Sequence, residues 1–172
     1  MKKLVVGLGN PGQKYRNNRH NAGHMFVAET GKMQERAGEQ MSGVRVLKTD
    51  SFMNESGKFV VRVLDDWGNK GDWGGWGKNL FIVHDDLDLP LGKFKIQFGV
   101  GPKVHYGVQS VETELGTGDF WRIRVGVDNR DSGQARMTGE KYVLEDFTGE
   151  EKKILEEVFL KIWEELTTLV RD

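Results

Sequence analysis

The sequence predicts a single-domain α/β/α sandwich built on a twisted, mixed and largely parallel sheet. Short apolar runs of strand length alternate along the chain with longer segments whose apolar residues recur at helical spacing. One run, Leu80 to Val83, is apolar throughout, which is typical of a strand buried in a parallel sheet. With 172 residues and no repeat, linker or low-complexity tract, the chain is expected to form one domain spanning residues 1–172.

The expected elements follow in alternation. Strands are expected at Lys3–Leu8, Val44–Leu47, Leu80–Val83, Lys93–Phe98 and Trp121–Val127. Helices are expected at about Ala22–Arg36, Glu55–Asp65 and Gly107–Leu115, followed by a last helix that starts with the capping-box pattern Thr148-x-x-Glu151. Asn54 is expected to cap the second helix. Tyr142 and Val143 are expected in a strand that leads to the last helix.

The loop after the first strand contains the pattern Gly7-x-Gly9-x-x-Gly12, which raises the possibility of a dinucleotide-binding motif. That motif needs its third glycine in an opening helix and an acidic residue at the end of a second strand. Here Pro11-Gly12 is typical of a turn, and Glu29 lies within a helical pattern. We therefore exclude the motif.

Residues 67–79 combine glycines, charges and three tryptophans without any period, which predicts a loop. The tryptophans could stack on bases, but base rates for aromatic burial favour packing on a neighbouring apolar surface.

Composition narrows the class of protein. The chain has no cysteine, which excludes disulfides, thiolate metal ligands and a cysteine nucleophile, and is compatible with a reducing compartment. The apolar run after Lys3 is too short for a signal peptide, and no run approaches membrane-spanning length. We expect a cytoplasmic protein without a membrane partner.

The formal net charge is −1, but the charges are unevenly distributed. Residues 1–24 and 93–105 carry lysines and arginines without any acid, and both runs flank loops that we expect to carry the site. A local basic face can bind a phosphate backbone, although ordinary solvated lysines explain the same pattern equally well.

Three polar residues are placed to meet at one end of the sheet: Asn10, His20 and Asp85. A histidine can take a proton from water, and an adjacent carboxylate stabilises the imidazolium that forms, which suffices for ester hydrolysis. Taken alone, His20 is better explained as a hydrogen-bonded histidine at a helix start. Asp85, Asp86 and Asp88 with His84 could instead hold a divalent cation or form a turn. Successive side chains on a strand face opposite ways, so all four cannot converge, and we expect no metal and no cofactor.

The stretch GLGNPGQKYRNNRHNAGH, residues 7–24, resembles the N-terminal motif of the bacterial peptidyl-tRNA hydrolase family. Three later stretches match the family in the same order: Phe52-Met-Asn-Glu-Ser-Gly57, Val83-His-Asp-Asp-Leu-Asp-Leu-Pro90 and, more loosely, Arg122-Ile-Arg-Val-Gly126. The resemblance implies that His20 is the catalytic base, that Asp85 supports it and that Asn10 positions the substrate. It also implies a substrate groove lined by Tyr15, Phe52 and Asn54.

The chain departs from the family between Gly99 and Gly107. The family has a glycine-rich segment ending in Gly-His-Asn-Gly, whereas this chain has Val104-His105-Tyr106-Gly107, with Val100 also replacing a glycine. Tyr106 therefore stands where an asparagine contacts the substrate. We expect His105 and Tyr106 at the substrate, with Tyr106 either stacking on the terminal adenine or packing under the altered loop.

These observations predict an esterase, independent of metal, that cleaves the bond between a peptide and the 3′ ribose of its tRNA. The expected partner is peptidyl-tRNA, held at its 3′ CCA end and acceptor region, and the expected phosphate contacts are Lys93, Lys95, Lys103 and Arg122. No obligate protein partner is inferred, and a monomer is expected. The alternative is a catalytically impaired RNA-binding relative of the same fold.

Overall fold

The computed structural model describes residues 2–37, 41–68, 71, 73–131, 133–134 and 137–171. Within these residues, five strands form one sheet in the order β2-β1-β3-β5-β4. The strands are β1 (Lys3–Gly7), β2 (Val44–Lys48), β3 (Leu80–Pro90), β4 (Phe94–Phe98) and β5 (Trp121–Asp128). Only the β4–β5 pair is antiparallel in this described sheet, which confirms the predicted mixed, largely parallel arrangement.

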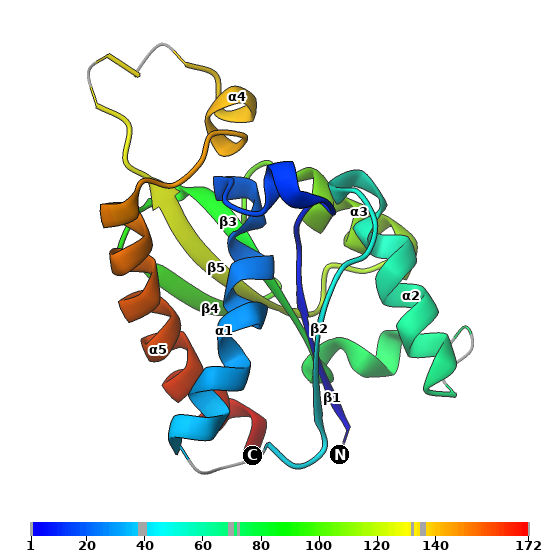
Figure 1. The fold of residues 1–172 in the computed structure, drawn as a ribbon. Coiled ribbons are helices and arrows are strands. Elements are labelled where there is room, and N and C mark those ends of the chain that lie inside the picture. Colours follow the sequence, from blue (N-terminus) through cyan, green and yellow to red (C-terminus); the bar gives the residue numbers. More distant parts are fainter. Residues whose placement is uncertain are drawn as a thin grey trace.

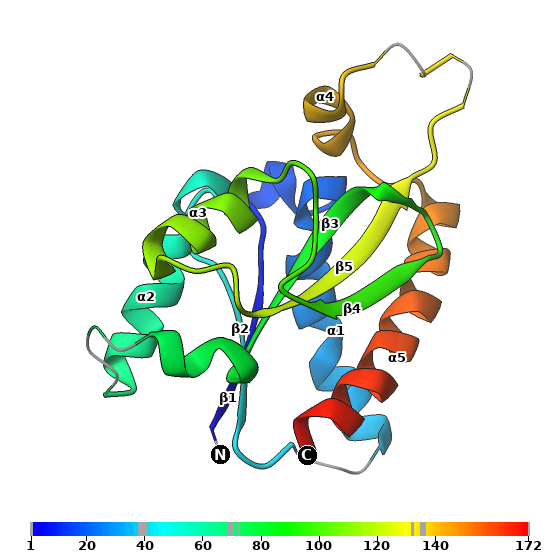
Figure 2. The same ribbon diagram turned by 180° about the vertical axis from the view of Figure 1, so that it is seen from behind.

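Helices cover both faces of the sheet (Figures 1 and 2). On one face, α1 (Ala22–Ala37) and α5 (Gly149–Arg171) share an apolar core with β-strand residues such as Phe81 and Val83. On the other, α2 (Ser56–Asp66) and α3 (Tyr106–Leu115) pack over residues such as Leu80 and Ile82. Each face of the sheet thus has its own core, as the sandwich prediction requires.

Strand β3 is longer than the sequence predicted. Its apolar part ends at Val83, but the polar residues that follow continue to pair with β5, with His84 opposite Arg124 and Asp85 opposite Val125. Their backbone hydrogen bonds keep them in the sheet although their side chains are polar. As a result, successive side chains from His84 onward face alternate sides of the sheet.

The predicted strand at Tyr142 and Val143 is wrong. These residues lie in a short helix, α4 (Gly139–Val143), whose first turn is capped by the Thr138 hydroxyl, which accepts a hydrogen bond from the Lys141 amide at 3.4 Å. Both side chains are buried, as strand residues would also be. Tyr142 and Val143 are residue types that favour strands, and the capping threonine favours the helix instead.

The tryptophan-rich segment packs onto the protein, as expected. Trp67, Trp73 and Trp76 all lie against the core under α2 and α3, and Trp76 is buried. The Trp73 indole also donates a hydrogen bond to Asp65 at 3.0 Å. Residues 69, 70 and 72 of this segment lie outside the described part of the chain.

The capping box of the last helix is confirmed. The Glu151 amide donates to the Thr148 hydroxyl at 3.2 Å, and the Thr148 amide donates to the Glu151 carboxylate at 2.8 Å. Among the described helices none combines the length and the apolar composition that crossing a bilayer requires.

Candidate active site

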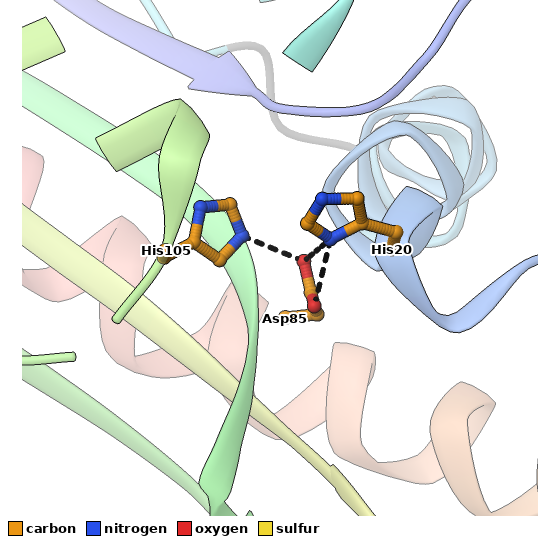
Figure 3. Close-up of side chains that lie close together, drawn as sticks. All are labelled: His20, Asp85 and His105. Atoms are coloured by element: carbon orange, nitrogen blue, oxygen red, sulfur yellow. Dashed lines mark hydrogen bonds and ion pairs between the residues drawn. The ribbon is translucent and has the colours of Figure 1, made fainter. Parts of the chain in front are cut away.

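Three side chains meet at the carboxyl end of the sheet (Figure 3). His20 lies in a short 3₁₀ turn, Arg19–Asn21, that leads into α1, Asp85 projects from β3, and His105 immediately precedes α3. His20 Nδ1 lies 3.0 Å from both carboxylate oxygens of Asp85, and His105 Nε2 lies 2.8 Å from Oδ1. Segments far apart in the sequence thus place one carboxylate between two imidazoles.

The hydrogen bonds of His105 fix where its proton lies. Its Nδ1 accepts hydrogen bonds from the backbone amides of Gly107 and Val108, each at 3.2 Å, and thereby caps α3. A neutral imidazole has one N–H, which must then be on Nε2 and point at Asp85. That nitrogen has no lone pair left for a metal ion, so the donor set fits a hydrogen-bonded trio rather than a metal centre.

The same reasoning assigns the atoms of His20. Its Nδ1 donates to Asp85, which leaves the lone pair on Nε2, and no described residue occupies that nitrogen. The His20 side chain is 12% exposed, whereas that of Asp85 is 3% exposed. Within this trio, His20 can therefore take a proton from a molecule arriving from solvent.

The charges of the site favour protonation of His20. Burial lowers the pKa of His20, but the Asp85 carboxylate outweighs burial, so the pKa is raised above its ordinary value of 6.5. Burial likewise raises the pKa of Asp85, but the two histidines lower it far below its ordinary range. Asp85 thus stays ionised and stabilises an imidazolium at His20.

Asn10 is held by Asn21, which directly follows His20 in the sequence. The Asn10 amide donates to the Asn21 side-chain oxygen at 2.8 Å, and the Asn21 side-chain nitrogen donates back to the Asn10 carbonyl at 2.9 Å. The Asn10 side-chain oxygen accepts from the Met53 amide at 2.8 Å. Its side-chain NH₂ group has no partner among the described residues and remains available as a donor.

The residues expected in the substrate groove lie next to Asn10. The rings of Tyr15 and Phe52 meet edge to face with centroids 6.3 Å apart, and Phe52 is half exposed. Asn54 lies in the 3₁₀ turn Met53–Glu55, ahead of α2. Its side chain is exposed and makes no capping hydrogen bond, which contradicts the expected N-cap and leaves its amide free in the described structure.

The acidic residues after Asp85 do not join it. Asp86 faces the other side of β3 and accepts a hydrogen bond from Arg124 Nε at 2.7 Å, while Asp88 is bound to the Lys103 amide at 3.1 Å. His84 is fully buried, and burial together with the nearby His105 lowers its pKa to about 3. The four residues of the alternative cation site therefore do not converge.

The expected phosphate contacts divide into two groups. Lys93, Lys95 and Lys103 are exposed on or beside β4. Arg122 is 2% exposed and pairs with Glu112 on α3, so its guanidinium is enclosed by the protein and the expected phosphate contact is wrong. Arg122 lies opposite Ile82 of β3, on the face of the sheet that α2 and α3 cover, which explains its burial.

A buried ion pair beside His20 escaped the sequence analysis. Arg19 Nη2 lies 3.0 and 2.9 Å from the two carboxylate oxygens of Glu151, and its guanidinium stacks 4.2 Å from the centroid of Tyr142. Glu151 was expected to cap a helix and nothing more. The pair links the turn that carries His20 to the start of α5. The only hint of it in the sequence is that Arg19 is adjacent to His20.

A pocket of about 850 Å³ lies beside the trio rather than over it. Asn10, Asn21 and His24 line it together with residues of the Lys48–Asp50 segment and of α5. His20, Asp85 and His105 are not among its lining residues. The pocket thus adjoins the Asn10 loop without including the three residues of the trio.

The known proteins to which this chain is similar are peptidyl-tRNA hydrolases. The family model described as peptidyl-tRNA hydrolase matches residues 4–172. The peptidyl-tRNA hydrolase of Desulfitobacterium hafniense is 37% identical over 92% of this chain and 88% of its own, and that of Pseudothermotoga lettingae is 33% identical over 99% and 91%. The crystal structure of the Acinetobacter baumannii peptidyl-tRNA hydrolase, 24% identical, superimposes with a TM-score of 0.77 over 99% of this chain and 89% of that one. This chain belongs to the peptidyl-tRNA hydrolase family.

Proposed function

We propose that this chain hydrolyses the ester between a peptide, or an N-blocked amino acid, and the 3′ ribose of tRNA, and so releases free tRNA for reuse in translation. The observation that carries the proposal is the His20–Asp85 pair, in which Nδ1 is bound to the carboxylate and Nε2 is free to receive a proton. Membership of the peptidyl-tRNA hydrolase family supplies the substrate class.

In the first step, a water molecule bound at His20 Nε2 gives up a proton as its oxygen attacks the ester carbonyl carbon. Asp85 stabilises the resulting imidazolium. The tetrahedral intermediate then collapses, the bond to the 3′ oxygen breaks, and His20 returns the proton to that oxygen. The products are a peptide carboxylic acid, which loses its proton to solvent and becomes a carboxylate, and tRNA with a free 3′ hydroxyl. The histidine is then ready for another turnover.

The Asn10 side chain is proposed to stabilise the intermediate. Its oxygen is bound by the Met53 amide, which fixes the orientation of the side-chain amide and leaves its NH₂ group as a donor without a partner among the described residues. A fixed donor aimed at the developing oxyanion contributes more than a mobile one, because it needs no reorganisation during the reaction. Asn10 thus combines substrate positioning with charge stabilisation.

Tyr15, Phe52 and Asn54 are proposed to bind the substrate near the ester. Their rings and amide lie exposed or half-buried beside Asn10, and the Tyr15–Phe52 pair offers flat apolar surface for a base or a side chain. His105 has both ring nitrogens engaged within the protein, so its proposed role is to position Asp85 rather than to contact the substrate.

Lys93, Lys95 and Lys103 are proposed to contact tRNA phosphates in the acceptor region. They lie exposed along β4 and the loop that leads to His105, while the chain as a whole is close to neutral. A few localised cations suffice, because counterion release depends on the contacts made and not on net charge. We further propose that residues 1–172 act as one domain, as a monomer in the cytoplasm.

Release of labelled N-acetyl-amino acid from its tRNA by the purified protein in the presence of EDTA tests the proposal. Multiple turnover in EDTA is expected, because the proposed mechanism draws its nucleophile from His20 and water alone. Tight tRNA binding with no release would contradict the proposal and favour an RNA-binding protein of the same fold.

A further inference from the structure

The loop that carries Asn10 is held by side chains from two neighbouring elements. The carbonyl of Gly9, the residue just before Asn10, accepts a hydrogen bond from the Thr49 hydroxyl at 3.1 Å. Thr49 directly follows β2, and its amide donates to the Gly7 carbonyl at 3.1 Å. His24 Nε2, on α1, lies 2.8 Å from the Thr49 hydroxyl oxygen. A short chain of hydrogen bonds thus runs from α1 through Thr49 to the backbone beside Asn10.

The single hydroxyl proton of Thr49 sets the direction of these bonds. That proton is used at the Gly9 carbonyl, so the hydroxyl oxygen accepts from His24, whose proton lies on Nε2. Burial, together with the nearby Lys48, lowers the pKa of His24 to about 4, so the ring is neutral near pH 7. Thr49 itself is buried. His24 therefore keeps one tautomer in the pH range in which His20 accepts a proton.

The ring of His24 also packs directly on the Asn10 loop. A Cβ added to Gly9 would come within 2.6 Å of the imidazole, so no side chain fits between the loop and the ring. Gly23 allows this close approach of α1, since a Cβ there would lie 2.5 Å from the Leu8 amide nitrogen. Helix α1 therefore supports the loop by direct contact as well as through the hydrogen bonds of His24.

The start of the same helix carries the proposed base. His20 and Asn21 lie in the turn that leads into α1, which begins at the carboxyl end of β1 (Figure 1), and His24 lies about one helical turn after His20. Asn21 binds the backbone amide and carbonyl of Asn10, while His24 acts through Thr49 on the preceding carbonyl. The base and the loop with the proposed oxyanion donor are thus attached to one element.

Tyr106, where this chain departs from the family, takes no part in this support. Its hydroxyl donates to Glu140 on α4 at 2.7 Å, and its ring is half exposed rather than packed under the altered loop. That bond is open to water, whereas the bond from Thr49 to the Gly9 carbonyl is buried.

We propose that His24 and Thr49 are positioning residues for Asn10, because they hold the Gly9 carbonyl and with it the Asn10 side chain where the oxyanion forms. The inference rests on the proposed function. Both residues act through the loop, since the Thr49 hydroxyl and the His24 donor are each bound within the protein. A donor stabilises the transition state most when its position is fixed beforehand, so a loosened loop is expected to slow the chemical step rather than weaken tRNA binding.

Removal of one hydroxyl provides the first test. Thr49→Val keeps the shape of the side chain and is expected to lower the single-turnover rate on labelled N-acetyl-aminoacyl-tRNA roughly two- to tenfold, with tRNA affinity unchanged. Thr30→Val is the matched control, because Thr30 is also buried and its hydroxyl donates to the Val27 carbonyl within α1 at 2.7 Å. Thermal denaturation is expected to show similar losses of stability in both variants, whereas only Thr49→Val slows the reaction.

A double-mutant cycle with Asn10 separates positioning from a general structural role. Asn10→Ala removes the proposed donor and is expected to lower the rate about a hundredfold to a thousandfold. Adding Thr49→Val to Asn10→Ala is then expected to change the rate by less than about 1.5-fold, because the group that Thr49 positions is gone. A general structural effect would lower the rate by the same factor in both backgrounds.

Variants of His24 test the other end of the hydrogen-bond chain. His24→Leu fills much of the space but removes the donor to Thr49, and is expected to lower the rate roughly two- to tenfold. The amide of His24→Gln can donate from a position close to that of Nε2, so this variant is expected to stay within about twofold of the wild-type rate.

A Thr49→Val rate within about 1.5-fold of the Thr30→Val rate, roughly the scatter of such measurements and below the twofold lower bound expected here, would overturn the proposal. An undiminished effect of Thr49→Val in the Asn10→Ala background, equal losses in His24→Leu and His24→Gln, or a near wild-type rate in Asn10→Ala would also overturn it. If the unmodified protein releases no labelled amino acid, the proposed function itself fails, so the two failures are distinguishable.

Discussion

Asp85 and Asp86 are adjacent on β3 and equally buried, at 2% exposure each, yet they face opposite sides of the sheet and have different partners. Asp86 is bound to Arg124, whose guanidinium is charged at all relevant pH values. Asp85 is bound to His20 and His105, whose charge depends on a proton. The first carboxylate is neutralised permanently, and the second is balanced only when a histidine is protonated.

The difference shows that the partner, more than burial, decides what a buried carboxylate can do. The Asp86–Arg124 ion pair joins β3 to β5 and contains no group that the proposed mechanism uses, so it contributes to the structure of this region. The Asp85 charge instead favours the imidazolium that forms at His20 as water is deprotonated. Two neighbouring residues of one type therefore serve stability and catalysis separately.

The largest expected effect of replacing one of these two carboxylates is on turnover. Asp85→Asn is expected to lower kcat by about a hundredfold to ten-thousandfold, because the imidazolium loses its counter-charge. Asp86→Asn is expected to keep kcat within about fivefold of the wild-type protein, a margin far smaller than loss of a general base. The measurement is kcat on saturating N-acetyl-aminoacyl-tRNA, with tRNA affinity as the control. Equal losses in the two variants would contradict the separation of roles.

The second effect is on stability, and it is expected to be larger for Asp86→Asn than for Asp85→Asn. Asp86→Asn leaves the buried Arg124 without its counter-charge and is expected to lower the free energy of unfolding by about 3 kcal/mol. Asp85→Asn is expected to have a smaller effect, because the two histidines can remain neutral. Urea denaturation of both variants measures the difference, and a greater loss of stability in Asp85→Asn would count against it.

The sequence predicted the sheet and the His20–Asp85 pair but not the full arrangement around them. Apolar periodicity was enough for the layers, and the alternation of a strand already implied that Asp85 and Asp86 diverge. The sequence could not show that His105 would cap α3 with one nitrogen and bind Asp85 with the other, since a histidine is not a usual capping residue and Asp85 lies 20 residues away in the sequence. Arg122 looked like a surface cation because a basic residue next to a loop gives no sign of a buried partner such as Glu112.

The third effect is on pH dependence. His20 must be neutral to accept a proton, and Asp85 raises its pKa, so kcat/KM is expected to fall as pH drops through a value above 6.5. In Asp85→Asn the raising charge is gone and burial alone lowers the pKa, so the acid limb is expected to move to lower pH. His24, whose pKa burial and Lys48 lower to about 4, titrates well below this range. An acid limb at the same pH in Asp85→Asn would contradict the assignment, and Asp86→Asn is the matched control.

The smallest effect is on the salt dependence of tRNA affinity, and it is expected to differ between the exposed Lys103 and the buried Arg122. Lys103→Glu is expected to flatten the log-log salt dependence of tRNA affinity by roughly 0.7 to 0.9 per lost contact. Arg122→Gln is expected to leave the slope unchanged and to lower stability, because its guanidinium is buried against Glu112. Salt titrations of the two variants measure both slopes. A flatter slope in Arg122→Gln alone would reverse the assignment.

Single-turnover hydrolysis by His20→Ala, with enzyme in excess over labelled N-acetyl-aminoacyl-tRNA and tRNA affinity measured in parallel, tests the central claim most directly. If His20 Nε2 takes the proton from water, the rate of the chemical step is expected to fall by about a hundredfold to ten-thousandfold while tRNA affinity stays close to that of the wild-type protein. A rate within threefold of the wild-type value at full binding would contradict the claim and remove His20 from the mechanism.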